Sequence, residues 1–255
     1  MSFEFNPADI ITPKIKGMIE GGGLSAVARK FLDMANIEVI SSLDPEASDK
    51  MHKKLNTEAG LIISNHPGHF DYYAILNLLE REDIKIVVGK TGYKKLAPII
   101  GVDHLIQAKS SMSISEAKEF LKITKDHIEN GGVVLLFPTG GKDNVEKEND
   151  DLKFESGLGT FLRKVLRPTD MVYSFNIDPK DIRSIVDEKI DRNVGIFTGI
   201  ATKGLINTNS FKEKKQIHIQ ESYSQASEWQ DIVNATSNED DNVALAEHFL
   251  NQFSK

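Results

Sequence analysis

Short apolar runs alternate with helical patterns from residue 60 onward, and this alternation constrains the fold more than any other feature. Each apolar run is long enough for a buried strand, and each helical pattern is long enough to return the chain to the start of the next strand. Such crossovers place consecutive strands in parallel. The sequence therefore predicts an α/β fold with a mostly parallel central sheet flanked by helices.

The expected elements follow from these patterns. Strands are expected over residues 61–64, 84–88, 105–108, 133–137, 171–177, 194–198 and 216–221, the last of them at an edge of the sheet. Helices are expected from Tyr72, over 91–100 with a break at Pro98 and Gly101, over 113–130, over 157–166, after 178 and at the C-terminal end. The helix over 113–130 is the clearest, because Ser113 and Glu116 match a capping box and Ile114 begins its apolar face.

Two helical patterns separated by Gly21, Gly22 and Gly23 precede this region. We expect an N-terminal helical segment over residues 1–35, packed on or appended to an α/β domain over residues 36–255. The chain does not start with a basic stretch followed by an apolar core, and no apolar run is long enough to span a bilayer. A cytoplasmic protein is expected, and a peripheral contact with the inner face of a membrane stays open.

Charge and cysteine content exclude several kinds of function. The formal net charge of −7 argues against nucleic acid as a partner, because phosphate backbones require a basic surface. The chain has no cysteine, which excludes disulfides, cysteine-based zinc sites and a cysteine nucleophile. Five lysines nevertheless gather in one part of the sequence, and solvated surface is the simpler explanation for most of them: Lys85, Lys90, Lys94, Lys95 and Lys109.

The turn from Asn65 to Asp71 joins a predicted strand to a predicted helix and carries reactive groups. His66 and Asp71 are the usual parts of a general base and the carboxylate that orients it. Residues five apart on a regular helix differ by about 140° and would not meet, but Pro67 and Gly68 can bend the segment. Asp71 can then accept a hydrogen bond from one ring nitrogen of His66, and the other nitrogen can take a proton. A helix-capping role is the plainer alternative.

A metal site is another interpretation of the same turn. His66, His69 and Asp71 carry ligand atoms, and Asp103 or His104 could supply one more. The sequence holds no second cluster with ligand spacing, so we expect no metal.

A second polar turn follows the strand predicted over 133–137. Its two glycines would allow a ligand to approach the backbone closely, and its lysine offers a charge to an anion. The spacing is not that of a P-loop, and the same residues also suit an ordinary turn. The stretch consists of Phe137, Pro138, Thr139, Gly140, Gly141 and Lys142.

Together, in this order and at this separation, the two turns resemble motifs of the glycerolipid acyltransferase superfamily, which includes glycerol-3-phosphate and lysophosphatidic acid acyltransferases. The family's first motif, Asn-His, four residues, then Asp, is complete here. Its third motif is Phe-Pro-Glu-Gly-Thr followed by Arg; here Thr139 replaces the Glu, Gly141 the Thr, and Lys142 the Arg. Its second motif resembles residues 101–109, with Lys109 where the family has an Arg that contacts the acceptor's phosphate.

The resemblance implies an O-acyltransferase that moves a fatty acyl group from acyl-CoA or acyl-carrier protein to the hydroxyl of a glycerol-phosphate, lysophospholipid or related lipid acceptor. It implies His66 as general base, Asp71 as its orienting group, and no cofactor besides the thioester co-substrate. The implied substrate-binding residues are Lys109, Phe137, Pro138, Thr139, Gly140, Gly141 and Lys142. The departures from the motifs indicate a changed acceptor. A metal-dependent hydrolase, a thioesterase and a non-catalytic lipid-binding protein are the alternatives.

Overall fold

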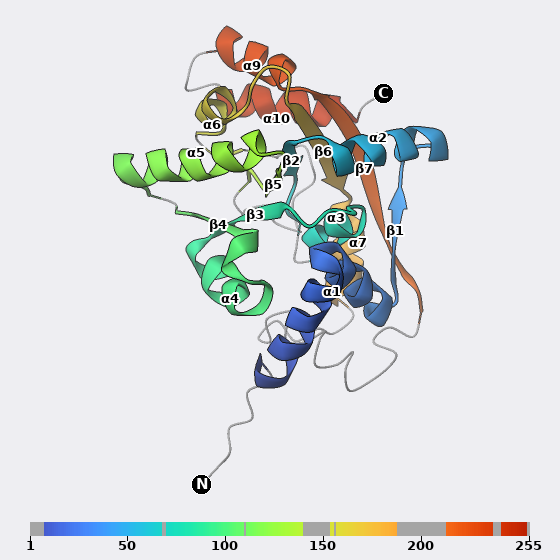
Figure 1. Cartoon of the computed structure of the whole chain (residues 1–255). Coiled ribbons are helices and arrows are strands. Elements are labelled where there is room, and N and C mark those ends of the chain that lie inside the picture. Colours follow the sequence, from blue (N-terminus) through green and yellow to red (C-terminus); the bar gives the residue numbers. More distant parts are fainter. Residues whose placement is uncertain are drawn as a thin grey trace.

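The computed structural model describes residues 8–67, 70–109, 111–139, 154–155, 157–187, 213–236 and 241–253 (Figure 1). Within these ranges the helices are α1 (Ala8–Ala35), α2 (Pro45–Thr57), α3 (Asp71–Asn77), α4 (Lys90–Ile100), the 3-10 turn η1 (Val102–His104), α5 (Ile114–Glu129), α6 (Leu158–Val165), α7 (Pro179–Asp187), α9 (Ala226–Ala235) and α10 (Asp241–Asn251). The strands are β1 (Ile37–Ser41), β2 (Gly60–Ser64), β3 (Ile84–Gly89), β4 (Leu105–Ala108), β5 (Val133–Leu136), β6 (Met171–Ile177) and β7 (Lys215–Gln225).

Across the described ranges, seven strands form one sheet in the order β1-β7-β6-β2-β5-β3-β4. Every neighbouring pair is parallel except β6 and β7, which run antiparallel. β2 and β6 lie near the middle and are buried along their whole length, as expected of strands covered on both faces. The prediction of a mostly parallel α/β sheet flanked by helices is confirmed.

Helices bury a separate core on each face of this sheet. One core joins β-strand residues to α1, α2, α3, α4 and α7, with Met51, Tyr73 and Ile182 among its members. The other joins the sheet to α5, α6, α9 and α10, with Leu162 and Trp229 among its members. In Figure 1, α6, α9 and α10 gather at the top of the view, whereas α1, α3 and α4 lie lower. None of the helices in the described ranges is long and apolar enough to cross a membrane.

α1 consists of two helices joined at Gly22 and Gly23, as the glycine run predicts. Gly23 has a φ of 67°, a left-handed conformation that favours glycine. The helix after the break packs against α3 and α4 and buries an apolar stripe, which consists of Leu24, Val27, Ala28, Phe31 and Leu32. The second half of α1 is therefore part of the core, while the division of the chain at residue 35 stays a prediction.

Three predicted details are wrong. β7 is not an edge strand, because it lies between β1 and β6 and pairs with both. α4 continues through Pro98 to Ile100, with Gly101 as its C-cap, since a proline in the last turn removes only one helical hydrogen bond. Ile114 is 78% exposed, because only the later part of its face, at Thr124 and Ile128, is covered.

β1, α2 and α9 were not expected from the sequence. The strand expected over 194–198 lies outside the described residues.

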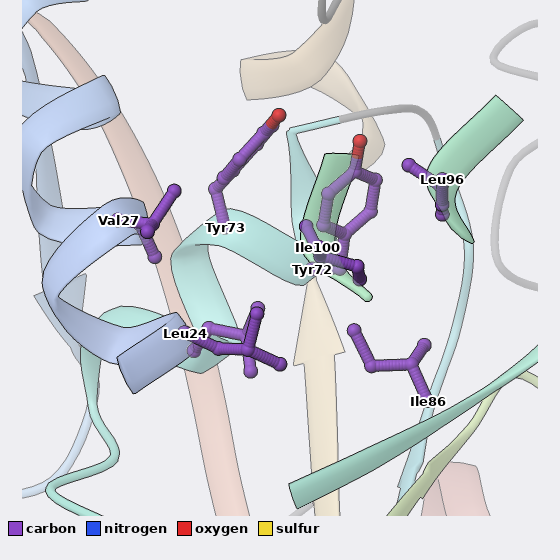
Figure 2. Close-up of a pocket in the computed structure, with 9 residues that line it drawn as sticks. Leu24, Val27, Tyr72, Tyr73, Ile86, Leu96 and Ile100 are labelled. Atoms are coloured by element: carbon purple, nitrogen blue, oxygen red, sulfur yellow. The ribbon is translucent and has the colours of Figure 1, made fainter. Parts of the chain in front are cut away.

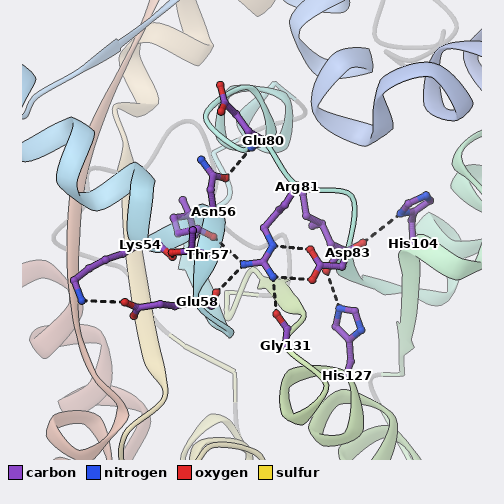
Figure 3. Close-up of polar contacts among 12 residues, drawn as sticks. Lys54, Asn56, Thr57, Glu58, Glu80, Arg81, Asp83, His104, His127 and Gly131 are labelled. Carbon is purple, nitrogen blue, oxygen red and sulfur yellow. Dashed lines mark hydrogen bonds and ion pairs between the residues drawn. The ribbon is translucent and has the colours of Figure 1, made fainter.

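Arg81 ties together the amino-terminal ends of three adjacent strands (Figure 3). Its Nε and Nη2 donate to the two carboxylate oxygens of Asp83, at 2.6 and 2.7 Å, just before β3. Its Nη1 donates to the carbonyls of Leu55 and Glu58 before β2, and Nη2 also donates to Gly131 before β5. All five guanidinium N–H donors are used, and the side chain is only 8% exposed. These bonds also hold the pKa of Asp83 below its usual value.

A second polar cluster joins β1, α2 and β7 around the buried carboxylate of Glu221. Ser41 Oγ donates to Glu221 Oε2 at 2.7 Å, and His52 Nε2 lies 3.2 Å from Oε1. The hydrogen bond to Glu221 raises the pKa of His52, and the nearby charges of Asp49 and Glu80 act in the same direction. The protonated imidazole is therefore favoured by folding.

This raised pKa predicts a pH dependence of stability. The contribution of His52 should be fully present below its unfolded-state pKa of about 6.5 and lost as pH rises through its higher folded-state pKa. The free energy of unfolding, measured with urea between pH 6 and pH 9, should fall more in the wild-type protein than in His52→Gln. All other groups titrate in both proteins. An equal pH dependence of the unfolding free energy in the two proteins would therefore contradict the raised pKa of His52.

Candidate active site

Several of the residues singled out in the sequence lie at the carboxyl-terminal edge of the sheet. β2, β5, β3 and β4 are adjacent in that order and run parallel, so the chain leaves all four at the same edge. Asn65 follows β2, Phe137 follows β5, Lys90 follows β3 and Lys109 follows β4. Open α/β sheets bind their ligands at this edge.

His66 and Asp71 are in direct contact there, as predicted. His66 Nδ1 lies 2.6 Å from Asp71 Oδ2. An ionised carboxylate only accepts hydrogen bonds, so Nδ1 carries the proton and Nε2 is the nitrogen that can accept one. Asp71 is fully buried, and its other oxygen accepts the Tyr72 backbone N–H at 2.6 Å. The imidazole side chain is 23% exposed, so the base is oriented from the interior and reachable from outside.

Asn65 fixes the position from which the chain turns toward His66. Its side-chain amide donates to the carbonyl of Ile177, and its side-chain oxygen accepts the N–H of the same residue, both at 2.8 Å. The buried amide thus fastens the end of β2 to the end of β6. The sequence identified Asn65 only as part of a motif and did not predict this role. The role depends on the pairing of β2 with β6, two strands that are far apart in the chain.

Phe137 and Thr139 bring the second turn to the first. The rings of Phe137 and His66 lie with their centroids 4.6 Å apart and tilted by 34°. Pro138 is buried, and its carbonyl accepts the backbone N–H of Glu155 at 2.7 Å, which holds the start of the turn. Thr139 is also buried. The two motifs, more than sixty residues apart in the chain, therefore share one site.

Gly140, Gly141 and Lys142 lie outside the described residues, and so does His69. The roles predicted for the first three stay predictions, and the alternative metal site that would use His69 is not tested by the described residues. Asp103 and His104 precede β4 and so lie at the opposite edge of the sheet from His66. Among the described residues, no group of three or more His, Asp or Glu side chains is arranged to hold a metal ion.

Lys109 lies at the same edge as His66 but farther along it. Its strand is three positions from β2, about 14 Å at the usual strand spacing. Its ammonium group contacts the carboxylate of Glu116, which also closes the capping box of α5 with Ser113. The hydrogen bond from Lys109 is the main reason that the pKa of Glu116 falls to about 2. An anionic ligand at Lys109 would have to compete with this carboxylate.

Lys90 is a second cation at this edge, and sequence reasoning did not single it out as a site residue. It directly follows β3, two positions and about 10 Å from β2, and is therefore closer to the base than Lys109. Its side chain is exposed and has no ion-pair partner within the described part of the chain. A search for polar residues directly after predicted strands, which finds Asn65 of the first motif, would also have found Lys90.

An apolar cavity lies behind this site, between α1, α3, α4 and β3. Figure 2 shows Leu24, Val27, Leu96 and Ile100 around it, with Tyr72 next in sequence to Asp71. Its volume of about 20 Å³ is too small for a ligand, and its lining is almost entirely apolar. Burial raises the pKa of Tyr72 above its usual value, and the charge of Asp71 acts in the same direction.

Comparison with known proteins gave one family match and one structural match. A family model described as "Acyltransferase" matches residues 46–177, slightly more than half of the 255 residues. The crystal structure of the 1-acyl-sn-glycerophosphate (LPA) acyltransferase PlsC from Thermotoga maritima is similar with a TM-score of 0.47 and 11% sequence identity, and the match covers 97% of this chain and 83% of that one. The comparison with curated proteins found no match. The family match spans His66, Asp71, Lys90, Lys109 and Phe137.

Proposed function

Because the chain belongs to the Acyltransferase family, we propose that it transfers a fatty acyl group from an acyl thioester, acyl-CoA or acyl-carrier protein, to the hydroxyl of a glycerol-phosphate, lysophospholipid or related acceptor. The observation that carries the proposal is the hydrogen bond between His66 and the buried Asp71 at the carboxyl-terminal edge of the sheet. A glycerolipid type of transfer is supported by the motif resemblance of both turns.

In this proposal His66 is the general base. Its Nε2 takes the proton from the acceptor hydroxyl, and the acceptor oxygen attacks the thioester carbonyl carbon. Asp71 keeps the proton on Nδ1 and stabilises the imidazolium that forms. The imidazolium then returns the proton to the departing thiolate, so no acyl group is attached to the protein. General-base catalysis of this kind contributes about 10²- to 10⁴-fold, and positioning must supply the rest.

Lys90 and Lys109 are proposed to form the anion-binding side of the site. They follow adjacent strands, and their positive charges suit a phosphate on the acceptor. Lysine binds phosphate as a point charge, whereas arginine grips it with two parallel hydrogen bonds. Glu116 further reduces the charge available at Lys109. A weakly held phosphate, or an acceptor with less negative charge, fits this arrangement better than a tightly clamped one.

Replacing Lys90 with Ala should raise the KM for a phosphorylated acceptor about tenfold, since a hydrogen bond to a charged group contributes about 1.5 kcal/mol. The KM for palmitoyl-CoA should change much less. Steady-state kinetics with lysophosphatidate would measure both values, with Lys109→Ala in parallel and Lys118→Ala, an exposed lysine of α5, as the control. A larger effect on the KM for palmitoyl-CoA would instead assign Lys90 to the phosphates of the donor.

The proposed function is tested by an acceptor screen with radiolabelled palmitoyl-CoA. The panel should include glycerol-3-phosphate, lysophosphatidate, lysophosphatidylcholine and monoacylglycerol, and an arm with EDTA covers the metal-dependent alternative. Formation of a labelled ester that persists in EDTA supports acyl transfer. Release of CoA without any ester would support a thioesterase, and no consumption of palmitoyl-CoA would support a lipid-binding protein.

Because lipid acceptors reside in membranes, we also propose that the protein is cytoplasmic and binds peripherally to the inner face of a membrane. Co-sedimentation of the protein with anionic vesicles tests this part separately from the chemistry.

A further inference from the structure

Thr139 holds a buried hydroxyl that nothing in the described part of the chain satisfies. The residue is 1% exposed, and its Oγ has no hydrogen-bond partner there. Buried polar side chains in folded proteins almost always have a partner, so each exception requires an explanation. A group that binds during the reaction is one such explanation, because the partner is then absent from the free protein.

The position of Thr139 points to the reaction centre. β5 pairs in parallel with β2 in a register that matches Leu136 to Ile63. Thr139 comes three residues after Leu136 and His66 three residues after Ile63, so both follow adjacent strands at the same edge of the sheet. The ring of Phe137, two residues earlier, already contacts the His66 ring. The unsatisfied hydroxyl therefore belongs to the turn that contacts the base, on the strand adjacent to β2, whereas Lys90 and Lys109 follow strands farther along the edge.

We propose that Thr139 is a catalytic residue whose hydroxyl donates a hydrogen bond to the carbonyl oxygen of the acyl thioester as this oxygen becomes negatively charged. The inference rests on the proposed acyl transfer. As the acceptor oxygen bonds to the carbonyl carbon, the π electrons of the C=O bond move onto its oxygen. The oxyanion accepts the bond from Thr139 Oγ–H. The electrons then return, the C–S bond breaks, and the thiolate takes the proton held by His66.

The Thr139 hydroxyl is suited to donate a hydrogen bond to the oxyanion. It is not suited to bind the phosphate of an acceptor, because it carries no fixed charge. Thr139 remains neutral at neutral pH and offers one donor. A donor that is already buried and has no partner to give up loses nothing when it turns to the oxyanion, which is the condition for effective stabilisation. The unsatisfied hydroxyl therefore destabilises the free protein, and its hydrogen bond forms only during the reaction.

The test compares Thr139→Val with Thr139→Ser. Val keeps the shape and removes the hydroxyl, so kcat for palmitoyl transfer from palmitoyl-CoA to lysophosphatidate should fall about 100-fold. Both KM values should change less than threefold, and Ser should restore most of the rate. Ser25→Ala is the matched control, because Ser25 of α1 is also buried with an unsatisfied hydroxyl among the described residues. Its activity should equal that of the wild-type protein.

Thermal unfolding of the same variants needs no substrate. Removal of an unsatisfied buried hydroxyl should raise the Tm of Thr139→Val by about 2 to 4 °C. A lowered Tm would show that the hydroxyl has a partner in the free protein and would overturn the inference. So would a kcat within twofold of wild type, an effect confined to the acceptor KM, or failure of Ser to restore the rate.

The inference and the proposed function can fail separately. If Thr139→Val is fully active while His66→Ala is not, acyl transfer is supported and the proposed role of Thr139 is wrong. If neither substitution affects ester formation, the catalytic roles of both His66 and Thr139 are wrong, whereas the proposed function is contradicted only if the wild-type protein forms no ester.

Discussion

Replacing His66 with Ala is expected to lower the rate of acyl transfer by about 10³-fold, which corresponds to about 4 kcal/mol of transition-state stabilisation. The reason is that the acceptor hydroxyl then loses the group that takes its proton, while the rest of the site stays in place. His66 is partly exposed and its ring contacts that of Phe137, so its removal disturbs the packing less than removal of a buried side chain would. Initial rates with labelled palmitoyl-CoA measure the loss.

The control is His218→Ala. His218 Nδ1 contacts Asp181 at 2.9 Å, so it forms a second His–Asp pair, but 53% of its side chain is exposed. Its removal should leave the rate within twofold of wild type. Asp71→Asn should slow transfer strongly as well, because the amide no longer fixes the proton on Nδ1. If His66→Ala and His218→Ala have equal rates, His66 is not the base.

Replacing Arg81 with Ala is expected to destabilise the protein by about 3 kcal/mol or more. The change removes five hydrogen bonds at once and leaves three backbone carbonyls and the Asp83 carboxylate without their donor. For a chain of this length, a loss of 3 kcal/mol corresponds to a fall in Tm of about 6 to 12 °C. Urea unfolding and thermal scans measure both quantities.

Arg167→Ala is the matched control for Arg81. Arg167 also donates to a nearby carboxylate through Nε and Nη2, at Asp170, but its side chain is 55% exposed. Asp170 is buried, but it also accepts the backbone N–H of Arg167, a bond that the variant keeps, and the exposed guanidinium contributes about 1 kcal/mol or less. Arg81→Lys should fall between the two, because an ammonium group cannot reach all four partners. Equal stabilities for Arg81→Ala and Arg167→Ala would show that the strand ends are held by other contacts.

The strands and helices that the sequence predicted are those with dense apolar patterns. β2, β5 and β6 are buried on both faces, and α5 carries a complete capping box. α2 was missed because only Met51 and Leu55 are buried in its 13 residues, too few to show helical periodicity. Its start was nevertheless marked, since Asp44 caps the helix and Pro45 takes the first position. The prediction that β7 lies at an edge was wrong because the local pattern of apolar residues does not specify the order of strands in the sheet.

The candidate site was predictable only where it is local in sequence. His66 and Asp71 are five residues apart, and the bend between them could be inferred from Pro67. The role of Asn65 and the closeness of Lys90 depend on which strands lie side by side. Local sequence does not specify that β5 lies between β2 and β3, or that β6 lies on the other side of β2.

The most direct test of the central claim is the fate of the label after a single turnover. Wild-type protein in excess is mixed with palmitoyl-CoA labelled in the acyl group and the best acceptor of the screen, and label is counted in ester, free acid and protein. Direct transfer assisted by His66 predicts one ester for each CoA released and no label on the protein. Label recovered mainly as free palmitate, or bound covalently to the protein, would contradict it.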